Sequence, residues 1–207
     1  FRHLKRMIRL GVDALEIDTF LPSVCHSKNH PHKPGANIIQ AKLDFFREAR
    51  AVAKRLNPDF ALIGETMLPE ARSVLDAFLS FRYFQEDGVI HRYLFPELRE
   101  QAVTVGNYGY DQINKALQLG LGVDTQIWGL RTTVLEGCPE LARYIGEVNR
   151  FRRKYASLLM HGLFRDTVGA SVTGDVFYSV IEGAKGEKAL VLRNPHERAI
   201  RVTARLD

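Results

Sequence analysis

Two short apolar runs decide the fold: GVDALEID at residues 11–18 and FALIGE at residues 60–65. Each run has the length of a β-strand, and the second is apolar almost throughout, as is typical of a parallel strand buried on both faces. Between them, residues 38–56 carry apolar side chains at helical spacing. A strand, a helix and a second strand predict a βαβ unit with a parallel sheet.

The same alternation continues on both sides of these runs. Residues 1–10 have helical spacing and are followed by Gly11, a residue type that commonly terminates helices. Downstream we expect helices at residues 69–79, 111–119 and 139–160 and strands at residues 80–84, 101–105 and 121–124, with residues 89–95 as an alternative to the strand at 80–84. This order of elements predicts an α/β fold.

The C-terminal segment has a different pattern. Residues 176–181, 189–193 and 200–203 have the composition of β-strands, and a Gly-containing turn at residues 182–186 separates the first two. We therefore expect an α/β domain over residues 1–162 and the start of a small antiparallel β-sandwich domain over residues 163–207.

Composition excludes several classes of protein. With 207 residues, 45% hydrophobic and 26% charged, the chain is globular, and no apolar stretch approaches the ~20 residues of a membrane span. The net charge of +5 is mild, and its densest basic group, Arg150 to Lys154, is interpreted as a solvated helix face, so no nucleic-acid or membrane partner is expected. Cys25 and Cys138 are far apart and form no CxxC motif, so we expect neither a disulfide framework nor a zinc ribbon.

The two decisive runs both end on a carboxylate, Asp18 and Glu65. The carboxyl ends of neighbouring parallel strands are where (β/α)₈ barrels place catalytic residues. Two carboxylates about one strand spacing apart, ~4.8 Å, would suit a retaining glycosidase, in which one attacks the sugar carbon and the other protonates the leaving oxygen. Alternatively, each carboxylate only caps a helix or joins a surface salt bridge.

Residues 11–18, the following long helix and Ile63-Gly64-Glu65 resemble the fourth and fifth strands of (β/α)₈ glycoside hydrolases such as the α-amylase superfamily. Residues 148–162 are similar to the last barrel helix of that superfamily, where it leads into a C-terminal β-domain. The resemblance implies that Asp18 is the nucleophile and Glu65 the acid/base, and that no cofactor is needed.

The sequence also departs from the α-amylase pattern. Relatives of α-amylase carry an arginine two residues before the nucleophile, where this chain has Glu16, and their histidine-aspartate pair after the seventh strand has no match here. The loop with Cys25, His30, His32 and Gly35 resembles more closely an uncharacterised family of glycosidase-like barrel proteins. Residues 94–97 and 120–124 also resemble that family.

Further residues are candidates for substrate binding. On the loop after the first strand, His30 and His32 could hydrogen-bond sugar hydroxyls; together with Cys25 they could instead hold a metal ion, which would make the protein a metal-dependent hydrolase. The remaining candidates are Tyr108 and Trp128, whose aromatic rings could stack on sugars or pack in the core, and Asp124, whose carboxylate could bind substrate or cap the helix that follows. If the acid lies instead near Glu86 or Asp87, as in barrels of the α-galactosidase type, Glu65 becomes a substrate-binding residue.

Together these features predict the C-terminal half of a (β/α)₈ barrel, about strands four to eight, in a glycoside hydrolase that acts on oligosaccharides or glycosides. A non-catalytic carbohydrate-binding barrel is the alternative. A complete barrel needs about 250 residues, so we expect further βα units upstream, where a signal peptide could also lie; without one, the location is cytoplasmic by default. An exposed sheet edge in this chain alone would favour pairing with a second copy.

Overall fold

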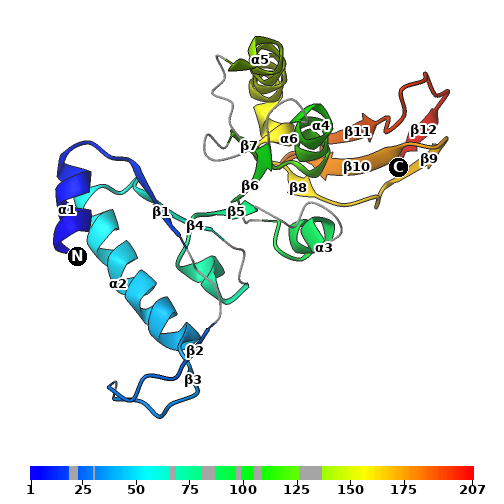
Figure 1. Ribbon diagram of the computed structural model, residues 1–207. Coiled ribbons are helices and arrows are strands. Elements are labelled where there is room, and N and C mark those ends of the chain that lie inside the picture. The colour runs from blue at the N-terminus through cyan, green and yellow to red at the C-terminus, as the bar shows by residue number, and fades with distance from the viewer. Residues whose placement is uncertain are drawn as a thin grey trace. The chain divides into compact units, whose positions relative to one another are not determined.

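The computed structural model describes residues 1–18, 23–29, 31–65, 69–80, 87–96, 99–104, 109–125 and 137–207 (Figure 1). The chain divides into two compact units, Phe1–Leu79 and Ser80–Asp207. None of the described helices is long and apolar enough to cross a membrane. The division at Leu79 differs from the domain boundary after residue 162 that the sequence suggests, and that boundary stays a prediction.

The first unit contains a parallel sheet with the strand order β1-β4-β5. Its elements are α1 (Arg2–Arg9), β1 (Ala14–Ile17), β2 (Val24–Cys25), β3 (Ala36–Asn37), α2 (Ile39–Leu56), β4 (Ala61–Gly64), the 3₁₀ helix η1 (Pro69–Ser73) and β5 (Ala77–Ser80). Helices α1 and α2 pack against each other (Figure 1). The predicted βαβ unit is therefore confirmed, with α2 as its connecting helix.

The core of this unit comes from the apolar face of α2 and from the strands. Leu43, Phe46, Ala49 and Ala53 recur every three or four residues along α2 and are all buried, as the sequence spacing predicts. Phe60, Leu62 and Phe78 of the strand segments are almost completely buried as well. Hydrophobic burial thus joins the helix layer to the sheet.

The expected helix at residues 69–79 is wrong. A short 3₁₀ helix, η1, ends at Ser73, and residues 77–80 form β5 instead. The backbone N–H of Asp76 donates to the Leu62 carbonyl at 2.8 Å, and Ile63 and Gly64 pair with Ala77 and Phe78. Pairing with β4, which lies far away in sequence, outweighs the local helical pattern.

The second unit combines a βαβ unit with antiparallel strands. Its elements are α3 (Asp87–Leu94), β6 (Arg99–Thr104), α4 (Gly109–Leu119), β7 (Gly122–Thr125), α5 (Pro139–Lys154), α6 (Ala156–Leu159), β8 (Leu163–Phe164), β9 (Ala170–Thr173), β10 (Phe177–Glu182), β11 (Lys188–Arg193) and β12 (Thr203–Leu206). Strands β6 and β7 are parallel, whereas β11-β10-β8 and β12-β9 form two antiparallel sheets.

Three expectations for this unit need correction. Residues 89–95 are not a strand, because residues 87–94 form the helix α3. The Arg92 side chain of α3 is buried and donates hydrogen bonds to the carbonyls of Leu119 and Pro96. The last strand lies at residues 203–206 rather than 200–203. The helix expected at residues 139–160 breaks at Tyr155 into α5 and α6, and the side chains of Phe151 and Tyr155 are exposed.

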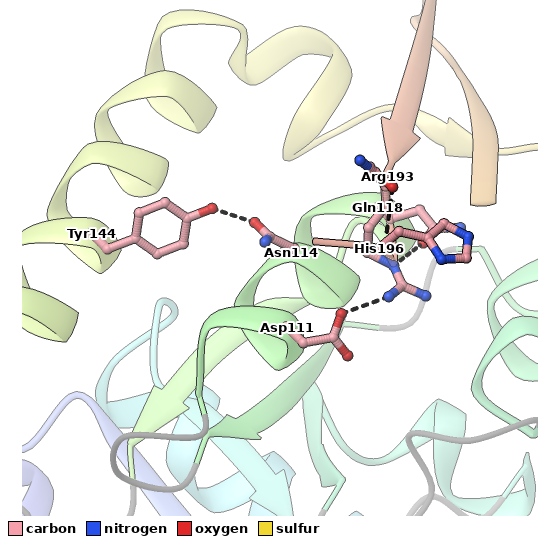
Figure 2. A network of polar contacts seen from close by, with 7 residues as sticks. Asp111, Asn114, Gln118, Tyr144, Arg193 and His196 are labelled. Atoms are coloured by element: carbon pink, nitrogen blue, oxygen red, sulfur yellow. Dashed lines mark hydrogen bonds and ion pairs between the residues drawn. The ribbon is translucent and has the colours of Figure 1, made fainter. Parts of the chain in front are cut away.

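Helix α4 is fastened to the antiparallel strands by a polar network (Figure 2). The Arg193 guanidinium, at the end of β11, donates to Gln118 Oε1 at 2.9 Å and to Asp111 Oδ1 at 2.6 Å. The guanidinium of Arg193 also lies over the Phe177 ring, with its Cζ 4.4 Å from the ring centroid. The buried Ser179 hydroxyl donates to the Gln118 carbonyl, and the Tyr144 hydroxyl on α5 donates to Asn114.

Helix α6 meets β10 with no space for a side chain at Gly162. A Cβ there would overlap the Leu158 carbonyl oxygen and lie 2.5 Å from Ile181 Cγ2. We therefore expect Gly162→Ala to lower the free energy of unfolding by about 1–3 kcal/mol, as measured by urea denaturation followed by circular dichroism.

Gly146→Ala is the matched control, because a Cβ at Gly146 on α5 meets no atom within 4 Å. This substitution should raise the free energy of unfolding by about 0.5–1 kcal/mol, since alanine loses less backbone entropy in a helix. A Gly162→Ala protein as stable as the wild type would contradict the described approach of α6 to β10.

Candidate active site

Asp18 and Glu65 follow directly after two strands that pair in parallel. The register of β1 and β4 pairs Leu15 with Leu62 and Ile17 with Gly64. The Glu65 N–H donates to the Ile17 carbonyl at 3.2 Å, so the ladder continues past the last strand residues. Asp18 and Glu65 therefore occupy equivalent positions at the carboxyl ends of neighbouring strands, where the expected adjacency requires them.

The two residues also share a face of the sheet. Successive strand residues alternate between faces, and the register places Leu15, Ile17, Leu62 and Gly64 on one face. A cavity bounded by α1 and α2 includes in its wall four consecutive residues of the β1 segment, Leu15 to Asp18, together with Leu62 of β4. The register continues to Asp18 and Glu65, of which Asp18 is exposed and lines the same cavity, whereas Glu65 is half-buried.

The cavity bounded by α1, α2 and β1 has a volume of about 410 Å³. Its wall is mainly apolar, with Leu4, Met7 and Phe45 among its residues, and Glu16 and Asp18 add carboxylates to it. Glu65 is not among the described residues that line it. This cavity therefore brings a substrate-sized volume to Asp18 but does not join the two carboxylates.

The loop after β1 contains a short hairpin that the sequence did not indicate. Strands β2 and β3 pair antiparallel, and the Gly35 N–H closes the hairpin by donating to the Cys25 carbonyl at 2.8 Å. Gly35 has a φ of +86°, which a glycine adopts readily. Gly35 was the residue in the sequence that could have indicated this turn, because it directly precedes the two residues that form β3.

The structure describes only some of the candidate residues on the loop after β1. His32 is half-buried, and its Nδ1 lies 3.0 Å from the Lys33 carbonyl, an acceptor to which the ring nitrogen donates. Cys25 is half-buried in β2, whereas His30 lies outside the described residues. Among the described residues no group of three or more His, Cys, Asp or Glu side chains is arranged to hold a metal ion.

The remaining candidates belong to the second unit. Asp124 lies in β7, with its backbone paired to Val103 of β6. Asp87 is the first residue of α3. Tyr108, Trp128 and Glu86 fall outside the described residues. The roles suggested for these residues stay predictions.

Asp76 holds the strand that carries Glu65, and sequence reasoning missed it. Its carboxylate lies just before β5 and accepts a hydrogen bond from the Leu62 N–H of β4 at 2.9 Å. Arg50 Nη1 of α2 lies 2.6 Å from Asp76 Oδ1, and Lys54 Nζ lies 3.7 Å from the same oxygen. One side chain thus connects β4, the start of β5 and α2.

These contacts change the acidity of Asp76. Burial acts to raise the pKa of the carboxyl, but the hydrogen bonds from Arg50 and Leu62 and the charges of Arg50 and Lys54 outweigh it. The pKa of Asp76 therefore lies below its ordinary value of 3.8. The folded unit favours the ionised carboxylate.

No family model matches the sequence. No curated protein matches it either. Among solved structures, the chain matches the ligand-free cyclic α-maltosyl-(1→6)-maltose hydrolase from Arthrobacter globiformis, at 12% identity and a TM-score of 0.47, covering 99% of this chain and 59% of that chain. Another is the α-amylase from Geobacillus thermoleovorans complexed with acarbose, at 13% identity and a TM-score of 0.47, covering 94% of this chain and 63% of that chain.

Both solved structures are of chains longer than this one. This chain spans about three fifths of the length of each. At this identity the likeness transfers no individual site residue to the present chain.

The lowered pKa of Asp76 makes the stability of the first unit depend on pH. The carboxylate contributes fully above the pKa of an unfolded aspartate, about 3.9, and its contribution is lost as the pH falls through the lower folded value. We expect Asp76→Asn to be less stable than the wild type at pH 7, and the difference to shrink on acidification below about pH 4. Urea denaturation across this range measures it.

Arg50→Gln provides the control background. Because Arg50 is the main partner that lowers the pKa, Asp76→Asn should have a smaller effect in the Arg50→Gln protein, with a coupling energy of about 1–2 kcal/mol. Equal effects of Asp76→Asn in both backgrounds would show that the pair is not coupled.

Proposed function

We propose that this chain is part of a glycoside hydrolase that cleaves O-glycosidic bonds with retention of configuration, and that its parallel strands belong to a (β/α)₈ barrel. Asp18 is the nucleophile and Glu65 is the acid/base. The observation that supports this most directly is the shared register of the two residues at the carboxyl ends of β1 and β4. That end of a parallel strand is where barrel enzymes carry catalytic groups.

The spacing favours retention over inversion. Paired strands lie about 4.8 Å apart, and equivalent residues on one face of two strands have carboxyl groups at a similar separation. Retaining enzymes need about 5–5.5 Å between their carboxyl groups, whereas inverting enzymes need about 6.5–9.5 Å to fit a water molecule. The spacing of neighbouring strands therefore supports the retaining arrangement over the inverting one.

The reaction then has two steps. In the first, an Asp18 carboxylate oxygen forms a bond to the anomeric carbon while the bond to the leaving oxygen breaks, and Glu65 donates its proton to that oxygen. In the second, Glu65 accepts a proton from water, the water oxygen attacks the anomeric carbon, and Asp18 leaves as a carboxylate. The exposed position of Asp18 is consistent with an ionised nucleophile that a sugar can reach.

The other candidates complete the proposal. His30, His32 and Asp124 would hydrogen-bond sugar hydroxyls, and Tyr108 and Trp128 would stack on sugar rings. The antiparallel strands after residue 162 would form the start of a C-terminal β-sandwich domain. The substrate is an oligosaccharide or a glycoside.

A non-catalytic carbohydrate-binding barrel is the second candidate. The observation that favours it is that the described wall of the 410 Å³ cavity includes Asp18 but not Glu65. In that case the carboxylates bind sugar hydroxyls separately. Binding of oligosaccharides without turnover would support this candidate against the hydrolase.

The hydrolase proposal predicts distinct effects of two substitutions in the full chain, assayed on a panel of aryl glycosides. Asp18→Asn should abolish turnover of every substrate. Glu65→Gln should lower kcat/KM by about 10²–10⁴-fold on p-nitrophenyl glycosides, and much less on 2,4-dinitrophenyl glycosides, because that leaving group departs without a proton. Nuclear magnetic resonance of the first product should show retained configuration.

Asp13→Asn and Asp59→Asn are matched controls. These carboxylates precede the same two strands, β1 and β4, and therefore lie at the amino ends of the strands, opposite to Asp18 and Glu65. Both variants should keep wild-type kcat/KM within about twofold. Undiminished turnover by Asp18→Asn, or an equal loss in Asp13→Asn, would overturn the assignment.

A further inference from the structure

Helix α1 is strongly basic and contains no compensating acidic residue. Helix α1 carries Arg2, Lys5, Arg6 and Arg9 and no acidic residue. These four residues account for four of the five net positive charges of the whole chain. The rest of the sequence is close to neutral, so the mild overall charge conceals a strongly basic segment.

The fold sorts the residues of α1 onto two faces. Leu4 and Ile8 are buried, and α1 packs against α2. Arg2, Arg6 and Arg9 are separated by four and three residues, which places them on one side of the helix, and all three are exposed. With His3 and Leu10 they line a surface hollow of about 490 Å³, which we call the α1 hollow.

The basic residues of α1 have no carboxylate partner among the described residues. In the part of the chain that the structure describes, no ion pair involves Arg2, Lys5, Arg6 or Arg9. Other helices neutralise their arginines locally: Asp44 pairs with Arg47 on α2, and Glu140 pairs with Arg143 on α5. Helix α1 lacks any acidic residue at such a spacing.

The stability of the helix explains only some of the positive charges on α1. Cations in the last turn interact favourably with the negative end of the helix dipole, which accounts for Arg6 and Arg9. Arg2 lies outside the last turn, so the helix dipole does not account for it. Three neighbouring guanidinium groups also repel one another. The arrangement therefore suits an external anion better than it suits the helix alone.

We propose that the α1 hollow binds a small polyanion with two or more phosphate or sulfate groups. Residues three or four apart on a helix are about 5–6 Å apart at Cβ, so one anionic group can reach two of the arginines. Arg2 and Arg9 are about 10 Å apart along the axis, and a ligand that uses all three needs several anionic groups. Guanidinium forks match the oxygens of phosphate and sulfate.

The size of the basic surface argues for a small ligand rather than a nucleic acid. A volume of about 490 Å³ lies within the ~300–1,000 Å³ of small-molecule sites. Specific nucleic-acid binding commonly uses many phosphate contacts along an extended surface, whereas here one eight-residue helix holds most of the net charge. Binding at this surface is separate from the proposed hydrolysis, since it uses neither Asp18 nor Glu65.

The test is calorimetric titration of the full chain at low salt with two probes, inorganic tripolyphosphate and sucrose octasulfate. Replacing all three arginines, R2Q/R6Q/R9Q, should weaken binding at least about tenfold, and added salt should weaken wild-type binding several-fold. The probe that binds more tightly shows whether the ligand is phosphorylated or is a sulfated saccharide.

The single variants R2Q, R6Q and R9Q should each weaken binding about two- to fivefold, and they test the proposal if the triple variant does not fold.

The matched control is R150Q/R153Q/K154Q, which removes the same charge from exposed positions on and near the end of α5. This variant should bind both probes within about twofold of the wild type. Equal losses in the two triple variants would show that net charge alone attracts the anion and would overturn the proposal. So would the absence of binding to both probes, or binding of single-stranded DNA without binding of either probe.

Discussion

The first unit depends on one half-buried carboxylate, that of Asp76, which lies outside the helices and strands that it connects. Asp76 lies between η1 and β5, accepts a hydrogen bond from β4 and pairs with Arg50 and Lys54 of α2. Apolar packing alone would allow the helix layer to slide over the sheet, because hydrophobic contacts have little directionality. A carboxylate with partners on both sides fixes the relative position of helix and strand. Since β1 takes its register from β4, the placement of Asp18 beside Glu65 follows from the same constraint.

Elements with a strong local pattern could be predicted from the sequence. Helix α2 and strands β1 and β4 were found because helical periodicity and short apolar runs are visible within a few residues. Strand β5 was missed because its cause is distant: Asp76 and residues 77–78 are held by partners in α2 and β4. The break at Tyr155 was missed for a similar reason, since the docking of α6 on β10 depends on Gly162 and Ile181.

The candidate site shows the same division. The adjacency of Asp18 and Glu65 could be predicted, because the geometry of parallel strands determines where strand ends lie. The cavity beside Asp18 could not, since its wall combines α1, β1 and α2 residues whose proximity depends on packing. The distribution of basic residues was also only partly visible in the sequence. The densest basic group, at residues 150–154, lies in helix α5, which also contains Glu140 and Glu147. Helix α1 has more widely spaced basic residues but contains no acidic residue.

The polar network around Arg193 bears on how this molecule could be recombined. Residues 163–207 can be regarded as a separate module, yet Arg193 bonds to Asp111 and Gln118 on α4, more than seventy residues upstream. A chimaera that exchanged only the C-terminal strands would leave the polar face of α4 opposite a foreign surface. A chain that lacked residues 163–207 would leave the buried Gln118 without its partners Arg193 and Ser179. The natural unit of exchange is therefore discontinuous in sequence and comprises α4 together with β10 and β11.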